Sequence, residues 1–253
     1  MKGRSADAGA SCESLGYHSA LDHELPRIFP VNRADIETAA SAVGCAEDFH
    51  RWYYDTGVWE SVRFLGVPCL KSVLDLWNYQ EIIHQLRPGL IVEFGTRHGG
   101  SALYFALIAR QVRPDALVLT VDIEDHLLDP RVPATPGIEF IKSSSVDAAV
   151  GARIAALRKQ LPGPVFAILD SDHRQPHVLQ EMLSLRALMQ AGDYLVVEDG
   201  NINGHPVLPG WGPGPLEAIM EYNRRFPDDY ERDLDRERKF GFTFAPMGFL
   251  RRR

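Results

Sequence analysis

Short apolar runs alternate with segments of helical periodicity between residues 90 and 199, and this alternation constrains the fold more than any other feature. The runs are LIVEF (90–94), LVLTVD (117–122), IEFIK (138–142), VFAILD (165–170) and YLVVED (194–199). The longer intervening segments carry apolar residues at positions i, i+3, i+4 and i+7, as amphipathic helices do. Strands that alternate with helices form right-handed βαβ units and a parallel sheet covered on both faces. The sequence therefore predicts a doubly wound α/β domain with a mostly parallel sheet.

The N-terminal third of the chain has a different pattern. Residues 49–66 are rich in aromatic side chains, and residues 73–86 have the periodicity of a helix that ends before Arg87-Pro88-Gly89. We predict a helical N-terminal extension over residues 1–87 and an α/β domain over residues 88–253. Aromatic side chains in the extension favour subunit contacts, and thus a homo-oligomer.

The segment after the fifth apolar run is rich in glycine and proline. Residues 200–214 cannot form a regular element, so we expect a loop over the edge of the sheet where a ligand binds. A helix is expected at 216–226, and residues 241–251 suggest a last strand or hairpin. Trp211 in the loop, with Trp59 and Arg63 in the extension, are candidates for contacts with a substrate.

Charge and cysteine content exclude several classes of protein. A formal net charge of −7 argues against a surface that neutralises nucleic-acid phosphates. Cys12, Cys45 and Cys69 are far apart and odd in number, which indicates neither a disulfide framework nor a zinc site and fits a reducing cytoplasm. The first residues lack the apolar stretch of an export signal, and no apolar run reaches the ~20 residues of a membrane span. We therefore expect a cytoplasmic protein without a nucleic-acid or membrane partner.

Carboxylates are concentrated where the apolar runs end. They are Glu93, Asp122, Asp170, Glu198 and Asp199. Because parallel strands end at one edge of a sheet, these side chains should lie close together there. The last three would raise one another's pKa values unless a cation lay among them, and oxygen ligands suit Mg²⁺. The alternative is that such acids cap the following helices, as Asp170 or Asp172 could do for the helix after Pro176.

The first turn after an apolar run reads Glu93-Phe94-Gly95-Thr96-Arg97-His98-Gly99-Gly100-Ser101. Glycines here let the backbone approach a ligand at the start of a helix, although the same glycines also permit tight packing of helix on strand. The spacing is not GxGxxG, so a dinucleotide and a nicotinamide oxidoreductase are disfavoured. Asp122 ends the next run, where a carboxylate accepts ribose hydroxyls. The two features together predict an adenosine-containing ligand without a pyrophosphate.

His173 follows Asp170 by three residues, which places it at the mouth of the expected cation site. A neutral imidazole with a pKa near ~6.5 accepts a proton at physiological pH, so His173 is a candidate general base. The alternative is that it packs against or caps the next helix. The neighbouring His177 is expected to be structural.

Four stretches resemble one known family of enzymes. GVPCLKSVLDLWNYQEII, IVEFGTRHGGSALYFA, ILDSDH…HVLQEM and YLVVEDGNINGH…GPGPLEAI look like the rhamnosyl O-methyltransferase and cephalosporin hydroxylase-like family, from about residue 60 to the C-terminus. The first turn is also similar to that of Mg²⁺-dependent catechol-type O-methyltransferases. The resemblance implies a Rossmann-like class I fold dependent on S-adenosylmethionine (SAM).

The resemblance also implies roles for single residues. It places the metal on Asp170, Glu198 and Asp199, and the general base on His173. It places SAM against Glu93, Gly95, Thr96, Gly99, Ser101, Asp122 and Ser145. Catechol-type enzymes carry a lysine near His173, where this chain has Arg174, so an alcohol is favoured over a catechol.

The resulting prediction is a SAM- and Mg²⁺-dependent O-methyltransferase. Its expected substrate is a sugar hydroxyl, such as that of a rhamnosyl group on a secondary metabolite, in which Asp170 and His173 act on the reacting hydroxyl. Two alternatives remain. One is methylation of a non-sugar hydroxyl, for example on a β-lactam intermediate, and the other is a non-catalytic partner subunit of the same fold.

Overall fold

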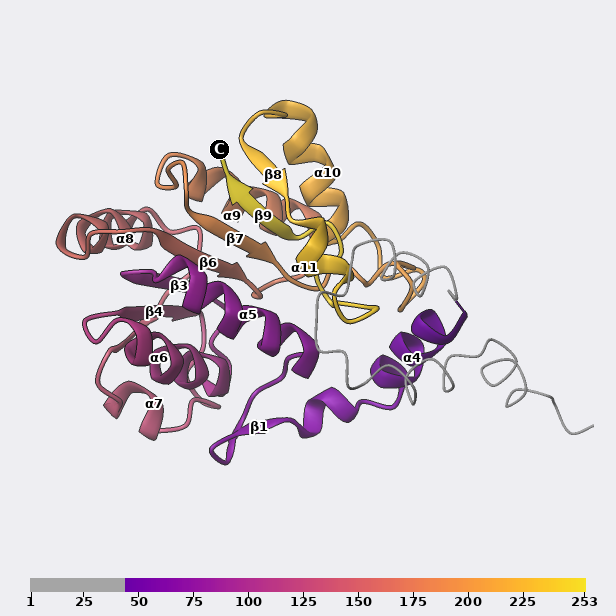
Figure 1. Cartoon of the computed structure of the whole chain (residues 1–253), viewed down its shortest axis with the longest axis horizontal. Coiled ribbons are helices and arrows are strands. Elements are labelled where there is room, and N and C mark those ends of the chain that lie inside the picture. The colour runs from indigo at the N-terminus through magenta and orange to yellow at the C-terminus, as the bar shows by residue number, and fades with distance from the viewer. Residues whose placement is uncertain (1–43) are drawn as a thin grey trace, which may run out of the picture.

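A computed structural model describes residues 44–253, which fold around a seven-stranded sheet (Figure 1). The strands run in the order β5-β4-β3-β6-β7-β9-β8. Those predicted from the apolar runs are β3 (Leu90–Phe94), β4 (Leu117–Asp122), β5 (Ile138–Lys142), β6 (Val165–Leu169) and β7 (Tyr194–Val197). All five are parallel to their neighbours among this group. The predicted doubly wound fold is confirmed.

Successive residues of the central strands face two separate cores. Ile91 of β3 packs in one apolar cluster and Val92 in the other, as the alternation of side chains along a strand requires. The helices on the first face are α5 (Val73–Leu86), α6 (Gly100–Val112) and the short α7 (Arg131–Ala134). Those on the second face are α8 (Ala148–Gln160), α9 (Gln175–Arg186) and α10 (Pro215–Arg225). Burial on both faces explains why these strands read as continuous apolar runs.

The C-terminal edge of the sheet is antiparallel. The predicted last strand is β9 (Phe249–Arg252), which pairs with β7, and β8 (Tyr230–Arg232) pairs with β9 from the outside. β8 was not predicted, because its three residues, two of them exposed and charged, form no apolar run. A short helix, α11 (Leu234–Arg238), connects these two strands.

The N-terminal extension, in the part that the structure describes, is helical at both ends. It contains α4 (Gly44–Asp55), the 3₁₀ turn η1 (Val58–Ser61), a small hairpin of β1 (Arg63–Phe64) and β2 (Val67–Pro68), and α5. Tyr53 of α4 packs with Phe242 and Phe244, so the extension contacts the C-terminal segment. Residues 1–43, which include Cys12, lie outside the described part, and Cys69 is a buried free thiol.

The strand order also locates the binding edge. From β3 the chain proceeds outward through β4 and β5, then returns to β6 on the other side of β3 and continues to β7. Ligands of open α/β sheets bind beyond the carboxyl ends of the strands at such a reversal. Within residues 44–253, no helix is both long and apolar enough to cross a membrane.

Candidate active site

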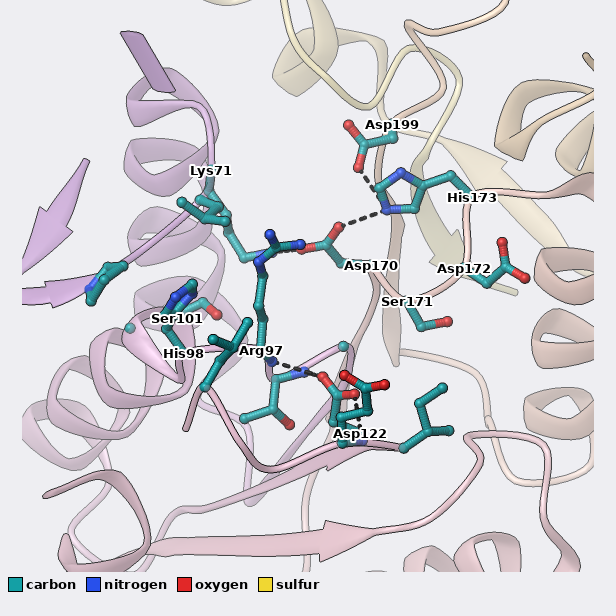
Figure 2. Close-up of a pocket in the computed structure, with 18 of the residues that line it drawn as sticks. Lys71, Arg97, His98, Ser101, Asp122, Asp170, Ser171, Asp172, His173 and Asp199 are labelled. Carbon is teal, nitrogen blue, oxygen red and sulfur yellow. Dashed lines mark hydrogen bonds and ion pairs between the residues drawn. The ribbon is translucent and has the colours of Figure 1, made fainter. Parts of the chain in front are cut away.

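Two of the predicted acids meet His173 where β6 and β7 end (Figure 2). The imidazole Nε2 lies 3.3 Å from Oδ1 of Asp170 and 3.2 Å from Oδ2 of Asp199. Ligand atoms of these three residues all lie within 4.8 Å of one another, a spacing that suits the ligands of one cation. The geometry therefore gives His173 two possible roles, as a ligand or as a base.

Glu198 takes part in a different contact. Its Oε1 accepts hydrogen bonds from Nζ of Lys71 at 2.8 Å and from the hydroxyl of Tyr79 at 2.9 Å. The same ammonium donates to Oδ2 of Asp170 at 2.6 Å. Lys71 thus bridges the ends of β6 and β7, and its side chain is only 2% exposed.

The cluster contains more acid than base. Burial disfavours the charged lysine, but Asp170 and Glu198 outweigh it and raise the pKa of Lys71 well above its usual value. Burial likewise disfavours the imidazolium, yet Asp199 and Asp170 raise the pKa of His173 to about 9. Burial raises the pKa of Glu198 to about 8 and that of Asp199 to about 6. Despite burial, Lys71 and His173 lower the pKa of Asp170 to about 2. The two cations therefore stabilise Asp170 as a carboxylate, whereas burial dominates at Glu198 and Asp199.

The capping alternative does not describe Asp170, because both of its oxygens are engaged by Lys71 and His173. Asp172 accepts a bond from the backbone amide of Arg174, the residue that precedes α9. Arg174 itself makes no side-chain cap. Asp172 therefore orders the loop before the helix.

The first turn passes very close to the end of β6. Gly95 has a φ of +98°, and a Cβ atom at this position would lie 1.9 Å from the carbonyl oxygen of Asp170. Only glycine fits such an approach. Gly99 has a different constraint, since its Cβ would meet Val132 at 2.7 Å. Gly99 thus permits close packing between the start of α6 and α7.

Asp122 fixes the position of the first turn. Its Oδ2 accepts backbone hydrogen bonds from Thr96 at 3.0 Å and Arg97 at 2.7 Å (Figure 2). Its Oδ1 accepts one from the amide of Glu124 at 3.1 Å. A carboxylate oxygen has capacity for a further bond, so Oδ1 can still accept a hydroxyl from a ligand.

Glu93 is fully buried beneath this turn. Thr120 donates to its Oε2 at 2.6 Å, whereas Oε1 has no hydrogen-bond partner within the described chain. Burial raises the pKa of Glu93 to about 7. Lys71 and the hydroxyl of Ser101 partly offset this effect of burial, so Glu93 supports the first turn from beneath.

One cavity of about 930 Å³ joins the strand ends. Predicted residues that line it are Gly95, Thr96, Ser101, Asp122, Ser145, Asp170, His173 and Asp199. Three predicted residues do not line the cavity and contact only residues around it: Glu93, Gly99 and Glu198. The suggested substrate residues Trp59, Arg63 and Trp211 also line the cavity.

Lys71 and Tyr79 were not predicted to take part in the site. Both lie in a segment that helped to establish the family resemblance, and both are buried at spacings of i and i+8 with Asp75 between them. A lysine, an aspartate and a tyrosine spaced four residues apart, the last two on α5, were a usable signal. The partners of Lys71 and Tyr79 lie 99 to 127 residues away, beyond any local pattern.

Comparison with known proteins decides the family. A family model described as Rhamnosyl O-methyltransferase/CmcI matches residues 56–253. A rhamnosyl O-methyltransferase of Mycobacterium bovis (strain BCG / Pasteur 1173P2) is 57% identical over 205 residues, which cover 81% of this chain and 84% of that protein. The chain belongs to the Rhamnosyl O-methyltransferase/CmcI family. The predicted family and enzyme class, an O-methyltransferase, are thereby confirmed.

Further members of the Rhamnosyl O-methyltransferase/CmcI family agree with this assignment. The Mycobacterium leprae (strain TN) rhamnosyl O-methyltransferase is 54% identical over 208 residues, covering 82% of this chain and 90% of that protein. The solved structure of cmcI-D160 with Mg and SAM superposes with a TM-score of 0.59 at 21% identity and covers 77% of each chain. That likeness shows the class I methyltransferase fold.

Proposed function

We propose that this protein is a SAM- and Mg²⁺-dependent O-methyltransferase that methylates a sugar hydroxyl, with a rhamnosyl group of a secondary metabolite as the acceptor. The observation that carries the proposal is the 57% identity to an enzyme named rhamnosyl O-methyltransferase. The cavity supports it, because one end presents the first turn with Asp122 and the other presents His173 between two carboxylates.

The residues of the first turn fit SAM. Oδ1 of Asp122 would accept a hydrogen bond from the ribose, and Glu93 would support Thr120 and Ser101 from beneath the cofactor. Because Gly95 has no side chain, the first turn packs directly against the backbone of Asp170 at the end of β6. Thr96 and Ser101 line the same part of the cavity. SAM supplies an electrophilic methyl group.

The acidic cluster fits Mg²⁺. Asp170 and Asp199 present carboxylate oxygens within 4.8 Å of each other beside His173, and Glu198 shares the ammonium of Lys71 with Asp170. Carboxylate oxygens are the ligands that Mg²⁺ prefers. We assign the metal to Asp170, Glu198 and Asp199. When bound, Mg²⁺ supplies positive charge that stabilises a hydroxyl oxygen as it loses its proton.

His173 removes the proton from the acceptor hydroxyl at Nε2. Asp170 and Asp199 both face this atom, so they hold the ring in place and stabilise the imidazolium that forms. To accept a proton, His173 must start as a neutral imidazole. Because Asp170 and Asp199 raise its pKa, this requires a second cation beside the two carboxylates. Trp59 and Trp211 in the cavity lining would contact the sugar.

The direct test is methyl transfer. Rhamnosyl-containing acceptors are incubated with the protein, SAM and Mg²⁺, and intact mass is measured for the gain of one methyl group. Transfer to these acceptors, its loss on exhaustive chelation and its return with Mg²⁺ are expected. Transfer only to acceptors without a sugar would contradict the substrate, and full turnover in chelator would contradict the metal.

A second test separates the two possible roles of His173. If His173 is the base, His173→Ala lowers the single-turnover rate about 10²-fold or more and retains affinity for Mn²⁺ and for S-adenosylhomocysteine. As a ligand, the same change weakens Mn²⁺ binding. His205→Ala is the matched control, since His205 also pairs with a carboxylate, that of Glu217, but does not line the cavity.

We further propose that the enzyme works in the cytoplasm as a homo-oligomer. The exposed aromatic residues Phe49 and Trp52 on α4 support subunit contacts through the N-terminal extension. Light scattering coupled to size exclusion measures the mass in solution. A mass equal to that of one 28.3 kDa chain would contradict the oligomer.

A further inference from the structure

A second polar cluster lies beside the cavity, after β5 and β6. Oγ of Ser145 lies 3.1 Å from Nε2 of His177, and the same nitrogen lies 3.3 Å from Oε1 of Glu181. His177 and Glu181 are one turn apart on α9, while Ser145 follows β5. Ser171, which follows β6, donates to Oε1 of Glu181 at 2.6 Å. The mechanism above uses none of these contacts.

The contacts determine where the proton of His177 lies. Nε2 faces two oxygen atoms, and one belongs to a carboxylate that is completely buried. A lone pair on Nε2 would repel both oxygens, so Nε2 carries the hydrogen. The carboxylate of Glu181 thereby fixes the tautomer of the ring, in the way that a second residue orients a functional histidine.

The two serines consequently differ in what they can donate. The hydroxyl proton of Ser171 is used by Glu181. The oxygen of Ser145 instead accepts the N–H of His177, which leaves its own hydroxyl proton to donate. Ser145 and His177 both line the cavity. The cluster thus presents a donor with a fixed direction to a ligand.

We propose that Glu181 and His177 are positioning residues that make Ser145 a hydrogen-bond donor to a ring nitrogen of the adenine of SAM. This inference rests on the proposed function. Ser145 follows β5, which is the neighbour of β4, and β4 ends at Asp122, the proposed ribose ligand. The base attached to that ribose therefore lies within reach of this part of the cavity. Adenine presents N1, N3 and N7 as acceptors, each of which can be replaced by carbon.

The test measures binding of S-adenosylhomocysteine and of its 1-deaza, 3-deaza and 7-deaza analogues by calorimetry, without any turnover. The wild-type protein should lose about three- to tenfold in affinity for one analogue, the effect of one hydrogen bond. Ser145→Ala and His177→Phe should each bind S-adenosylhomocysteine weaker by a similar factor, with no further loss for that analogue. Ser184→Ala is the matched control, because Ser184 lies on α9 and bonds only the backbone carbonyl of Glu181.

The outcomes distinguish failure of the proposed adenine contact from failure of the proposed function. Two results would contradict the proposed role of Ser145, His177 and Glu181 while leaving the methyltransferase function intact. One is that Ser145→Ala binds S-adenosylhomocysteine and all three analogues weaker than the wild-type protein by the same factor. The other is that the wild-type protein binds all four compounds equally. The wild-type comparison decides even where a variant fails to fold. A wild-type protein that bound no S-adenosylhomocysteine would overturn the proposed function as well.

Discussion

Replacing the ammonium of Lys71 tests whether the acidic cluster depends on an internal cation. Lys71→Met keeps an unbranched side chain of similar length but leaves Asp170 and Glu198 without their shared partner. Removing one partner of a buried ion pair costs about 3–5 kcal/mol, because an uncompensated charge stays buried. At about 2–4 °C per kcal/mol for a chain of this size, the melting temperature should fall by roughly 6–20 °C.

The loss should depend on pH. Glu198 has a folded-state pKa of about 8 even with Lys71 present, so in the variant it takes up a proton more readily still. The destabilisation should therefore be large at pH 8.5 and much smaller at pH 5.

Urea unfolding in the presence of chelator, followed by tryptophan fluorescence, measures the effect as a shift of the midpoint at constant slope. Lys142→Met is the matched control, since its ion pair with Asp125 is exposed and its loss should leave the midpoint nearly unchanged. Equal midpoints for the two variants at pH 8.5 would refute the view that Lys71 neutralises the cluster.

Other predictions concern the first turn and the metal-free protein. Gly95→Ala should unfold at lower temperature and lose cofactor affinity, since its Cβ would lie 1.9 Å from the carbonyl oxygen of Asp170. Gly192→Ala, which has a similar φ but no atom within 4 Å, is its control, and equal effects would contradict the clash. Asp122→Ala should weaken binding of S-adenosylhomocysteine by about 1–3 kcal/mol in calorimetry, and unchanged affinity would remove Asp122 from the site. Because the pKa of Glu198 is raised from 4.5 to about 8, its contribution to stability is complete below pH 4.5 and lost as pH rises through 8. Urea midpoints measured with chelator should therefore fall over this range and rise again on addition of Mg²⁺, whereas a midpoint that increased between pH 5 and 8.5 would contradict the assignment.

The sheet was predictable because its central strands are buried on both faces. β3 and β6 consist entirely of buried residues, so β6 is a continuous apolar run and β3 is interrupted only by Glu93. Gly95 follows the end of β3, and Asp170 follows the end of β6. The β1–β2 hairpin and β8 were not predictable, since strands of two or three residues are too short to carry a periodic signal. A local sequence pattern predicts a strand only where several consecutive residues are buried.

The candidate site was predictable only in part, for a related reason. Strand ends and the glycine turn lie in sequence next to the runs that locate them, and these features brought Asp170, Asp199 and Asp122 to one edge. Lys71 reaches that edge from a segment 99 residues before Asp170. The spacing of the acids in the sequence does not show that Lys71 pairs with Asp170 and Glu198.

Glu198 and Asp199 separate where the strand has ended. β7 ends at Val197 and Asp199 has a φ of +53°, so the chain turns between the two acids. Glu198 contacts Lys71 and Tyr79, whereas Asp199 faces His173. The three acids thus form two overlapping groups rather than one ring. Asp170 belongs to both, with Oδ2 on Lys71 and Oδ1 facing His173. A change at Asp170 must therefore disturb the internal cation and the proposed base together, while a change at either neighbour disturbs only one of them.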